Sequence, residues 1–240
     1  VRDIKHMLQT ASHVLPNSIA ELEILISTFE LPQLRAKSSV VVNAVEIDDP
    51  SPSTPSRGEV TLPDGDFVLQ VGRFEPIKGQ RSLIRSLMHD TEIPLVFVGA
   101  GIDSDYGQAC QHLGAERGNV HFLPPLPHSA LPAVYKKAKV HALPSMRESP
   151  GLVTLEAALQ GANCVVSVHA PLQEYFGELA WVCDPASDAS IRQAVLLALH
   201  SERSGALGKY TRHHFTWQHA ARQTLKAYEQ TLGFTRPQHE

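Results

Sequence analysis

From residue 66 onward, short and continuous apolar runs alternate with segments whose apolar residues recur at helical spacing. Runs of this kind, each followed by a helix, are typical of strands that are buried on both faces of a parallel sheet. We therefore expect an α/β fold, a Rossmann-like doubly wound parallel sheet. The expected strands are 66–72, 95–99, 119–123, 140–145, 164–168 and 180–183, and the expected helices are 80–90, 105–116, 128–138, 151–161 and 189–201, with a turn or helix at 171–178.

The first 47 residues have a separate pattern. Residues 3–12 have helical spacing, and a short apolar segment follows at 13–16. Ser18 is a natural N-cap for a helix over 19–29, and the β-branched run at 40–47 predicts a strand. This segment is therefore expected to form helix, strand, helix and strand.

The composition changes abruptly at Asp48. Residues 48–65 are rich in Pro, Ser, Asp and Gly, which disfavour both helices and strand pairing. We predict a linker over 48–65 that separates the N-terminal segment, 1–47, from a Rossmann-like domain over 66–213.

Composition and charge exclude several classes of protein. With 42% hydrophobic and 19% charged residues and a net charge of −4, the chain is expected to be a soluble globular protein and not a nucleic-acid binder. The three cysteines are too few for a disulfide framework, and the histidine spacing predicts no metal site. No apolar run reaches the roughly 20 residues of a membrane span. The expected location is the cytoplasm, or at most a membrane surface.

Ligands of doubly wound domains bind outside the carboxyl ends of the strands, so the residues that follow each strand deserve inspection. After the first expected strand, Gly72 allows a turn, and Arg73 and Lys78 follow it. Two cations at such a turn suit a diphosphate, because the Arg fork grips two oxygens and the Lys acts as a point charge. The alternative is a pair of solvated surface charges.

After the second expected strand, Gly99 and Gly101 permit close approach of a backbone. The full G-x-G-x-x-G pattern is absent, because position 104 is a serine. A nicotinamide cofactor is therefore not expected.

After the strand at 140–145, a turn leads into a helix that begins near Gly151 or Leu152, with Ser149 and Pro150 suited to the cap and first-turn positions. The helix N-terminus would add an anion site made of main chain. Glu148 and Glu156 fit beside an anion only if the ligand also offers hydroxyl groups. A nucleotide-sugar has both, whereas the alternative is that the two glutamates are ordinary surface acids.

The succession of GRF-x-x-x-KG, VGAG, NVHFL with ALPAVYKKA, and LPS-x-x-E-SPGLVTLEAALQG resembles the donor-binding half of a GT-B glycosyltransferase. The resemblance is to the retaining enzymes of family four, the glycosyl transferases group 1, and it covers roughly residues 66–232. It implies that 214–232 contain the C-terminal crossing helix and that 233–240 are a tail. The E-x7-E element, Glu148 to Glu156, is its most specific part.

The resemblance also implies roles for individual residues. Arg73 and Lys78 would hold the donor pyrophosphate, Glu148 would contact the transferred sugar, and Glu156 would bind the ribose. Chemistry would need no metal ion or other cofactor, with Glu148, Arg73 and Lys78 as the catalytic set and a UDP- or GDP-sugar as donor. The full set expected to face the donor is Gly72, Arg73, Lys78, Glu148, Ser149, Pro150, Gly151, Leu152, Val153 and Glu156.

Departures from the family pattern limit what the resemblance implies. Phe122-Leu123-Pro124-Pro125 replaces the usual F-x-G, and Ala170-Pro171 replaces a Gly-Gly, which leaves the base and the sugar open.

The first 47 residues resemble only the end of the family's N-terminal domain. The acceptor domain is therefore expected to be a missing partner, and the chain alone an inactive fragment. Peripheral contact with the inner membrane would run through that missing domain.

The function expected is the donor-binding part of a retaining hexosyltransferase in polysaccharide biosynthesis, which acts on a glycan, lipid or small-molecule acceptor. Two alternatives remain open. One is a non-catalytic module that binds a nucleotide-sugar, and the other is a GT-B sugar-nucleotide epimerase.

Overall fold

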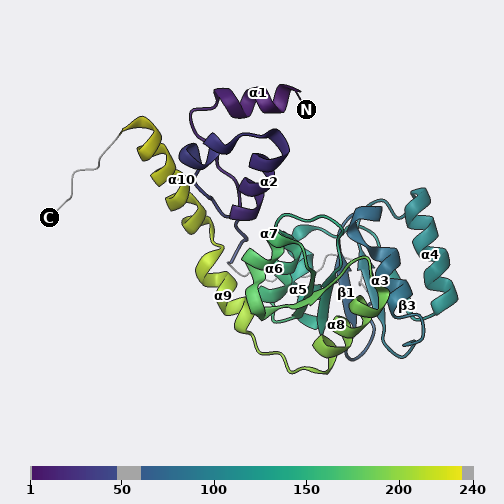
Figure 1. The fold of residues 1–240 in the computed structure, drawn as a ribbon. Coiled ribbons are helices and arrows are strands. Elements are labelled where there is room, and N and C mark those ends of the chain that lie inside the picture. The colour runs from purple at the N-terminus through teal and green to yellow at the C-terminus, as the bar shows by residue number, and fades with distance from the viewer. Residues whose placement is uncertain (1, 48–60, 234–240) are drawn as a thin grey trace. The chain divides into compact units, whose positions relative to one another are not determined.

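The computed structural model describes residues 2–47 and 61–233, which fall into two compact units (Figure 1). Unit 1 combines Val1–Glu46 with His213–Glu240, and unit 2 is Ile47–Arg212. Most of the predicted linker, 48–65, and all but the first residue of the predicted tail, 233–240, lie outside the described residues.

Unit 2 is built on a six-stranded parallel sheet, as the apolar runs predict. The strand order is β3-β2-β1-β4-β5-β6, and every pair of neighbours is parallel. This confirms the prediction of a doubly wound α/β domain. The strands are β1 (Val68–Val71), β2 (Leu95–Val98), β3 (Val120–Leu123), β4 (Val140–Leu143), β5 (Asn163–Ser167) and β6 (Trp181–Cys183).

Helices cover both faces of this sheet, which explains why its central strands read as continuous apolar runs. Along β1, Val68 packs in a core cluster with α3, α4 and α8, whereas Leu69 packs on the other face in a cluster with α5 and α6. Successive side chains of a strand point to opposite faces, so both must be apolar. The helices are α3 (Gln80–Ser86), α4 (Asp105–Arg117), α5 (Leu131–Lys137), α6 (Leu152–Leu159), α7 (Ala170–Phe176), α8 (Asp188–His200) and α9 (Ala206–His214), with 3-10 turns at η2 (Pro76–Lys78), η3 (His128–Ala130) and η4 (Gly177–Leu179).

The order of the strands places a switch point between β1 and β4. From β1 the chain steps to β2 and β3 on one side, and then returns to β4 on the other side. Ligands of doubly wound domains bind beyond the carboxyl ends of the strands at such a switch point. This edge is where the candidate site must be sought.

Unit 1 is helical and contains none of the expected strands. It holds α1 (Arg2–Thr10), α2 (Ile19–Phe29), η1 (Pro32–Lys37) and α10 (Trp217–Leu232). The strands predicted at 13–16 and 40–47 are wrong, because each segment makes a single parallel bridge, Val14 with Ser38 and Val45 with Thr216. A strand requires a ladder of such pairs with a neighbour, and β-branched composition alone does not supply one.

The C-terminal region forms two consecutive helices, α9 and α10. α10 lies within 214–232, where a helix was predicted, and α9 precedes that range except for its last residue, His214, and was not predicted. The break falls at Phe215 and Thr216, where the Thr216 hydroxyl accepts a hydrogen bond of 3.0 Å from the backbone N–H of His219 and so caps α10. Among the described residues, no helix has both the length and the apolar character needed to cross a membrane.

Candidate functional site

Two loops meet at the carboxyl edge of the sheet, one after β1 and one after β4. The backbone N–H of Met146 donates to the carbonyl of Ile77 over 2.8 Å. Gly79 lies so close to the other loop that an added Cβ would come within 2.3 Å of the Pro144 carbonyl oxygen, and its φ is +74°. Only glycine accepts both the left-handed conformation and this approach. The two loops are therefore fixed side by side.

Lys78 and Glu148, one from each loop, form a partly buried ion pair. The Lys78 Nζ lies 2.6 Å from Glu148 Oε2, and the two side chains are 20% and 11% exposed. The buried Ser145 hydroxyl donates to the same carboxylate oxygen over 3.3 Å, and the Ser149 N–H donates to Oε1 over 3.3 Å. Both oxygens of Glu148 are thus held at the switch point.

Two buried glutamines fix the loop after β1 by donating hydrogen bonds to its backbone carbonyls. Gln70 donates through Nε2 to the Lys78 carbonyl over 2.7 Å, and Gln80 donates to the Arg73 carbonyl over 2.7 Å. Each glutamine is 1% exposed. Sequence reasoning missed both residues, although Gln70 in the otherwise apolar strand VLQV was a usable signal, because a buried amide requires a partner.

Arg73 differs from Lys78 in exposure and in its partner. Its side chain is 71% exposed and lies 3.4 Å from Glu75 in the same loop. Gly72, directly before it, donates its N–H to the Val98 carbonyl over 2.9 Å, and a Cβ on Gly99 would meet the Gly72 carbonyl oxygen at 1.9 Å. The backbone of this loop is therefore tightly packed, whereas the Arg73 guanidinium extends into solvent.

The third predicted element, α6, begins at Leu152, within the predicted range, but its N-cap differs from the prediction. Gly151 is the N-cap, with φ 73° and no side-chain capping bond, and the helix starts at Leu152. The expectation that Ser149 and Pro150 occupy cap and first-turn positions is wrong, because the left-handed turn at Gly151 separates them from the helix. Pro150 is buried, Leu152 is 37% exposed, and Val153 packs on the α5 and α6 side of the core.

Glu156 lies one turn into α6 and has two aromatic partners. The Tyr135 hydroxyl donates to Glu156 Oε2 over 3.0 Å, and His128 Nε2 lies 3.3 Å from Oε1. Tyr135 is 1% exposed, while the His128 side chain is 72% exposed. Burial, and then the neighbouring Glu156 charge, raise the pKa of Tyr135 well above its usual range, so this hydroxyl stays protonated and donates.

Tyr135 and His128 were missed from the sequence. Both belong to the segment 128–138, which was interpreted only as a helix. An aromatic residue within an amphipathic helix is expected to be a core residue, and nothing local indicates that its hydroxyl reaches a glutamate on another helix.

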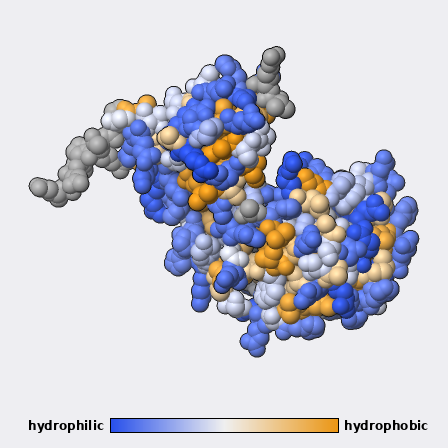
Figure 2. Space-filling view, in the orientation of Figure 1, coloured by the Kyte–Doolittle hydropathy of each residue, from blue (hydrophilic) through white to orange (hydrophobic). Residues whose placement is uncertain are grey.

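Exposed apolar residues surround the site. Ile77 follows β1, Met146 and Leu152 follow β4, and Val168 follows β5, and each is at least 37% exposed. Figure 2 shows that hydrophobic patches on the viewed face of unit 2 are bordered by hydrophilic residues. A rim of this kind suits a ligand that offers apolar surface as well as charge.

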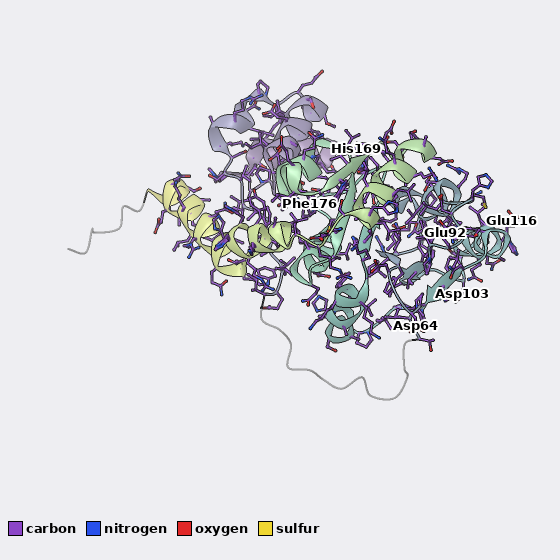
Figure 3. All side chains as sticks on the ribbon, turned by 90° about the horizontal axis from the view of Figure 1, so that it is seen from below. Asp64, Glu92, Asp103, Glu116, His169 and Phe176 are labelled. Atoms are coloured by element: carbon purple, nitrogen blue, oxygen red, sulfur yellow. The ribbon has the colours of Figure 1, made fainter. Side chains whose placement is uncertain are left out.

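Acidic side chains gather at another part of unit 2. Asp64, Glu92, Asp103 and Glu116 are all exposed, and in the view of Figure 3 they lie to one side of unit 2, away from His169. Among the described residues, no group of three or more His, Cys, Asp or Glu side chains could hold a metal ion.

The three cysteines, Cys110, Cys164 and Cys183, are free and buried. Burial raises the pKa of the Cys110 thiol to about 11 and that of Cys183 to about 12, and it raises the pKa of Cys164 further. Such thiols stay protonated and are poor nucleophiles.

Comparisons with known proteins place this chain beside sugar-transferring enzymes. A family model described as "Glycosyl transferases group 1" matches residues 55–214. The O-antigen chain mannosyltransferase B of Escherichia coli is 26% identical over 240 residues, which are 95% of this chain and 63% of that protein. The chain therefore spans less than two thirds of this curated relative.

Solved structures show the same fold. Sucrose-phosphate synthase from Thermosynechococcus elongatus superposes with a TM-score of 0.78 at 24% identity, over 96% of this chain and 61% of that one. Anabaena Alr3699/HepE, solved in complex with UDP and glucose, superposes with a TM-score of 0.74 at 19% identity, over 95% of this chain and 65% of that one.

Proposed function

The chain belongs to the glycosyl transferases group 1 family, and on this premise we propose that its carboxyl-edge site binds the nucleotide-sugar donor of a retaining hexosyltransferase. The observation that supports this most is the ion pair of Lys78 with Glu148 at 2.6 Å. A cation and an acid held together at the switch point suit a ligand whose diphosphate is followed at once by a sugar.

Each residue has one proposed role. Lys78 and Arg73 bind the diphosphate and stabilise charge on the departing nucleoside diphosphate. Glu148 accepts hydrogen bonds from the transferred sugar, and Glu156 accepts them from the ribose. The main chain of the turn, together with the N-terminal dipole of α6, completes the anion site. The main-chain contacts proposed are those of Gly72, Ser149, Pro150, Gly151, Leu152 and Val153.

The donor is proposed to be a UDP- or GDP-sugar, and the reaction to need no metal ion. Support for such a donor comes from a relative named an O-antigen chain mannosyltransferase and from a structure of the same fold that was solved in complex with UDP and glucose. The first also suggests a place in polysaccharide biosynthesis. The whole reaction is proposed to require an acceptor domain and to occur in the cytoplasm or at the inner membrane surface. The 240-residue chain alone should then transfer no sugar.

A thermal-shift panel of UDP-, GDP- and ADP-sugars tests the proposal. A ligand that binds only the folded state raises its stability by mass action. We expect at least one nucleotide-sugar to raise the unfolding temperature of the chain, and we expect no such rise for a double variant, Arg73→Ala with Lys78→Ala. An equal rise in the double variant would overturn the site.

A further inference from the structure

Glu156 is held differently on its two carboxylate oxygens, and this asymmetry carries an inference. Oε2 accepts a hydrogen bond of 3.0 Å from Tyr135, a side chain that is 1% exposed. Oε1 faces His128, whose side chain is 72% exposed. A ligand can replace the solvated imidazole at Oε1 but cannot displace the buried phenol at Oε2.

The Tyr135 ring has little freedom to move. It belongs to the core cluster formed with Phe67 and Leu69, and the ring of His141 meets it edge-on at 5.9 Å between centroids. Packing of this density fixes a side chain in one rotamer. A buried hydroxyl also needs a hydrogen-bond partner, and the one that the structure gives Tyr135 is Glu156.

We propose that Tyr135 is a positioning residue, which fixes the Glu156 carboxylate so that Oε1 is presented to the ribose hydroxyls of a nucleoside diphosphate. This inference rests on the proposed role of Glu156. A glutamate on a helix has three side-chain torsions, and without an anchor its carboxylate spreads over several rotamers. Tyr135 removes that freedom before the ligand arrives, so less entropy is lost on binding.

The test compares ligands with and without ribose hydroxyls. UDP and GDP are titrated calorimetrically beside their 2′,3′-dideoxy counterparts into the wild-type chain and Tyr135→Phe. We expect the variant to lose about 3- to 10-fold in affinity for UDP or GDP, the scale of immobilising one flexible side chain on binding. Affinity for the dideoxy ligand should not change, and an equal loss for both ligands would overturn the inference.

Two further variants separate positioning from structure. Tyr106→Phe is the matched control, because Tyr106 accepts a hydrogen bond of 3.3 Å from the Arg81 N–H on another helix, and it should leave both affinities unchanged. In a Glu156→Gln background, Tyr135→Phe should lower affinity much less than in the wild type, and a full additive loss there would contradict positioning.

The outcomes also separate this inference from the proposed function. If Glu156→Gln binds UDP and GDP as the wild type does, the ribose role fails. If Glu156→Gln weakens binding and Tyr135→Phe does not, only the positioning role fails. Should Tyr135→Phe not fold, Glu156→Asp takes its place: it keeps the charge, but withdraws the carboxylate from the fixed hydroxyl. A loss confined to UDP and GDP supports positioning, and wild-type affinity contradicts it.

Discussion

Lys78 and Glu148 lie 70 residues apart in the sequence and share a hydrogen bond of 2.6 Å at the carboxyl edge of the sheet. In the free protein, the residue proposed to bind the diphosphate, Lys78, therefore pairs with the residue proposed to bind the sugar, Glu148. The donor must reorganise this pair, because a diphosphate competes with Glu148 for the Lys78 ammonium.

The competition predicts opposite effects of Glu148→Gln on two ligands. Removal of the carboxylate charge frees Lys78, so affinity for UDP or GDP should rise. Affinity for the complete UDP- or GDP-sugar, relative to the diphosphate, should fall by about 1.5–3 kcal/mol, the scale of hydrogen bonds to a charged group. Calorimetric titration measures both, with Asp66→Asn as control at the amino edge, where Asp66 pairs with Lys139 at 3.9 Å. Parallel changes for the two ligands would contradict this account of the pair.

The same pair predicts a stability effect that does not depend on any ligand. Lys78→Ala leaves the Glu148 carboxylate, 11% exposed, without its cation. Loss of one partner of a buried pair costs more than loss of both. Urea unfolding should therefore show Lys78→Ala to be less stable than the double variant Lys78→Ala with Glu148→Ala, by about 1 kcal/mol or more. If the double variant were less stable than Lys78→Ala, this account of the ion pair would be contradicted.

Gly79 offers a test of how the two loops are fixed. Gly79→Ala would combine a left-handed backbone with a Cβ 2.3 Å from the Pro144 carbonyl oxygen. Gly233 is the matched control, because it has nearly the same backbone, φ 70° and ψ 19° against 74° and 21°, with nothing within 4 Å of its Cβ position. Gly233→Ala should cost about 1 kcal/mol, the usual cost of that conformation, and Gly79→Ala should cost clearly more. Equal costs in chemical denaturation would show that the loops are free to separate.

His141 predicts a pH dependence of stability. It is fully buried in β4, neither ring nitrogen has a hydrogen-bond partner among the described residues, and burial lowers its pKa to about 3. An unfolded histidine has a pKa of about 6.5. As the pH falls below about 6.5, His141 binds a proton in the unfolded state but not in the folded state. This residue therefore lowers the free energy of unfolding by about 1.4 kcal/mol per pH unit.

His141→Leu should remove this contribution between about pH 6 and pH 3. It should also stabilise the protein at pH 7, because it replaces buried polar atoms without partners by apolar ones. Urea unfolding at several pH values measures both effects, with the less buried His121 of β3 as control. The prediction fails if, below about pH 6, the free energy of unfolding of His141→Leu falls with pH as steeply as that of the wild type.

The sheet could be predicted because the apolar run that forms each strand can be recognised within a short segment of the sequence. Each strand of unit 2 is a mostly apolar run, and the helix that follows it has its own period. The same reasoning failed at 40–47, because this Val-rich segment forms no ladder with a neighbouring strand and only Val45 makes a bridge. Strand pairing is a long-range property, and composition does not report it.

The site could be predicted only in part, for a related reason. Lys78 and Glu148 follow strands whose carboxyl ends must meet at one edge, so topology brings them together. Tyr135 reaches Glu156 from another helix, and that contact depends on how α5 packs beside α6. The start of α6 was predicted near Gly151 or Leu152, where it lies, but its cap was not, because a left-handed glycine and a Ser-Pro pair are both acceptable caps in sequence and only Gly151 takes the capping position.

The central claim is that the Lys78 end of the carboxyl edge binds the diphosphate of a nucleotide-sugar. Calorimetric titration of UDP and GDP into the wild-type chain, Lys78→Ala and Lys139→Ala tests it directly. Lys139 is the matched control, because its side chain is 17% exposed and also ion-paired, but it precedes β4 and so lies at the opposite edge of the sheet. We predict that Lys78→Ala weakens binding of one diphosphate by about 1.5–3 kcal/mol and that Lys139→Ala leaves it unchanged. Equal affinities of the wild type and Lys78→Ala would contradict the account.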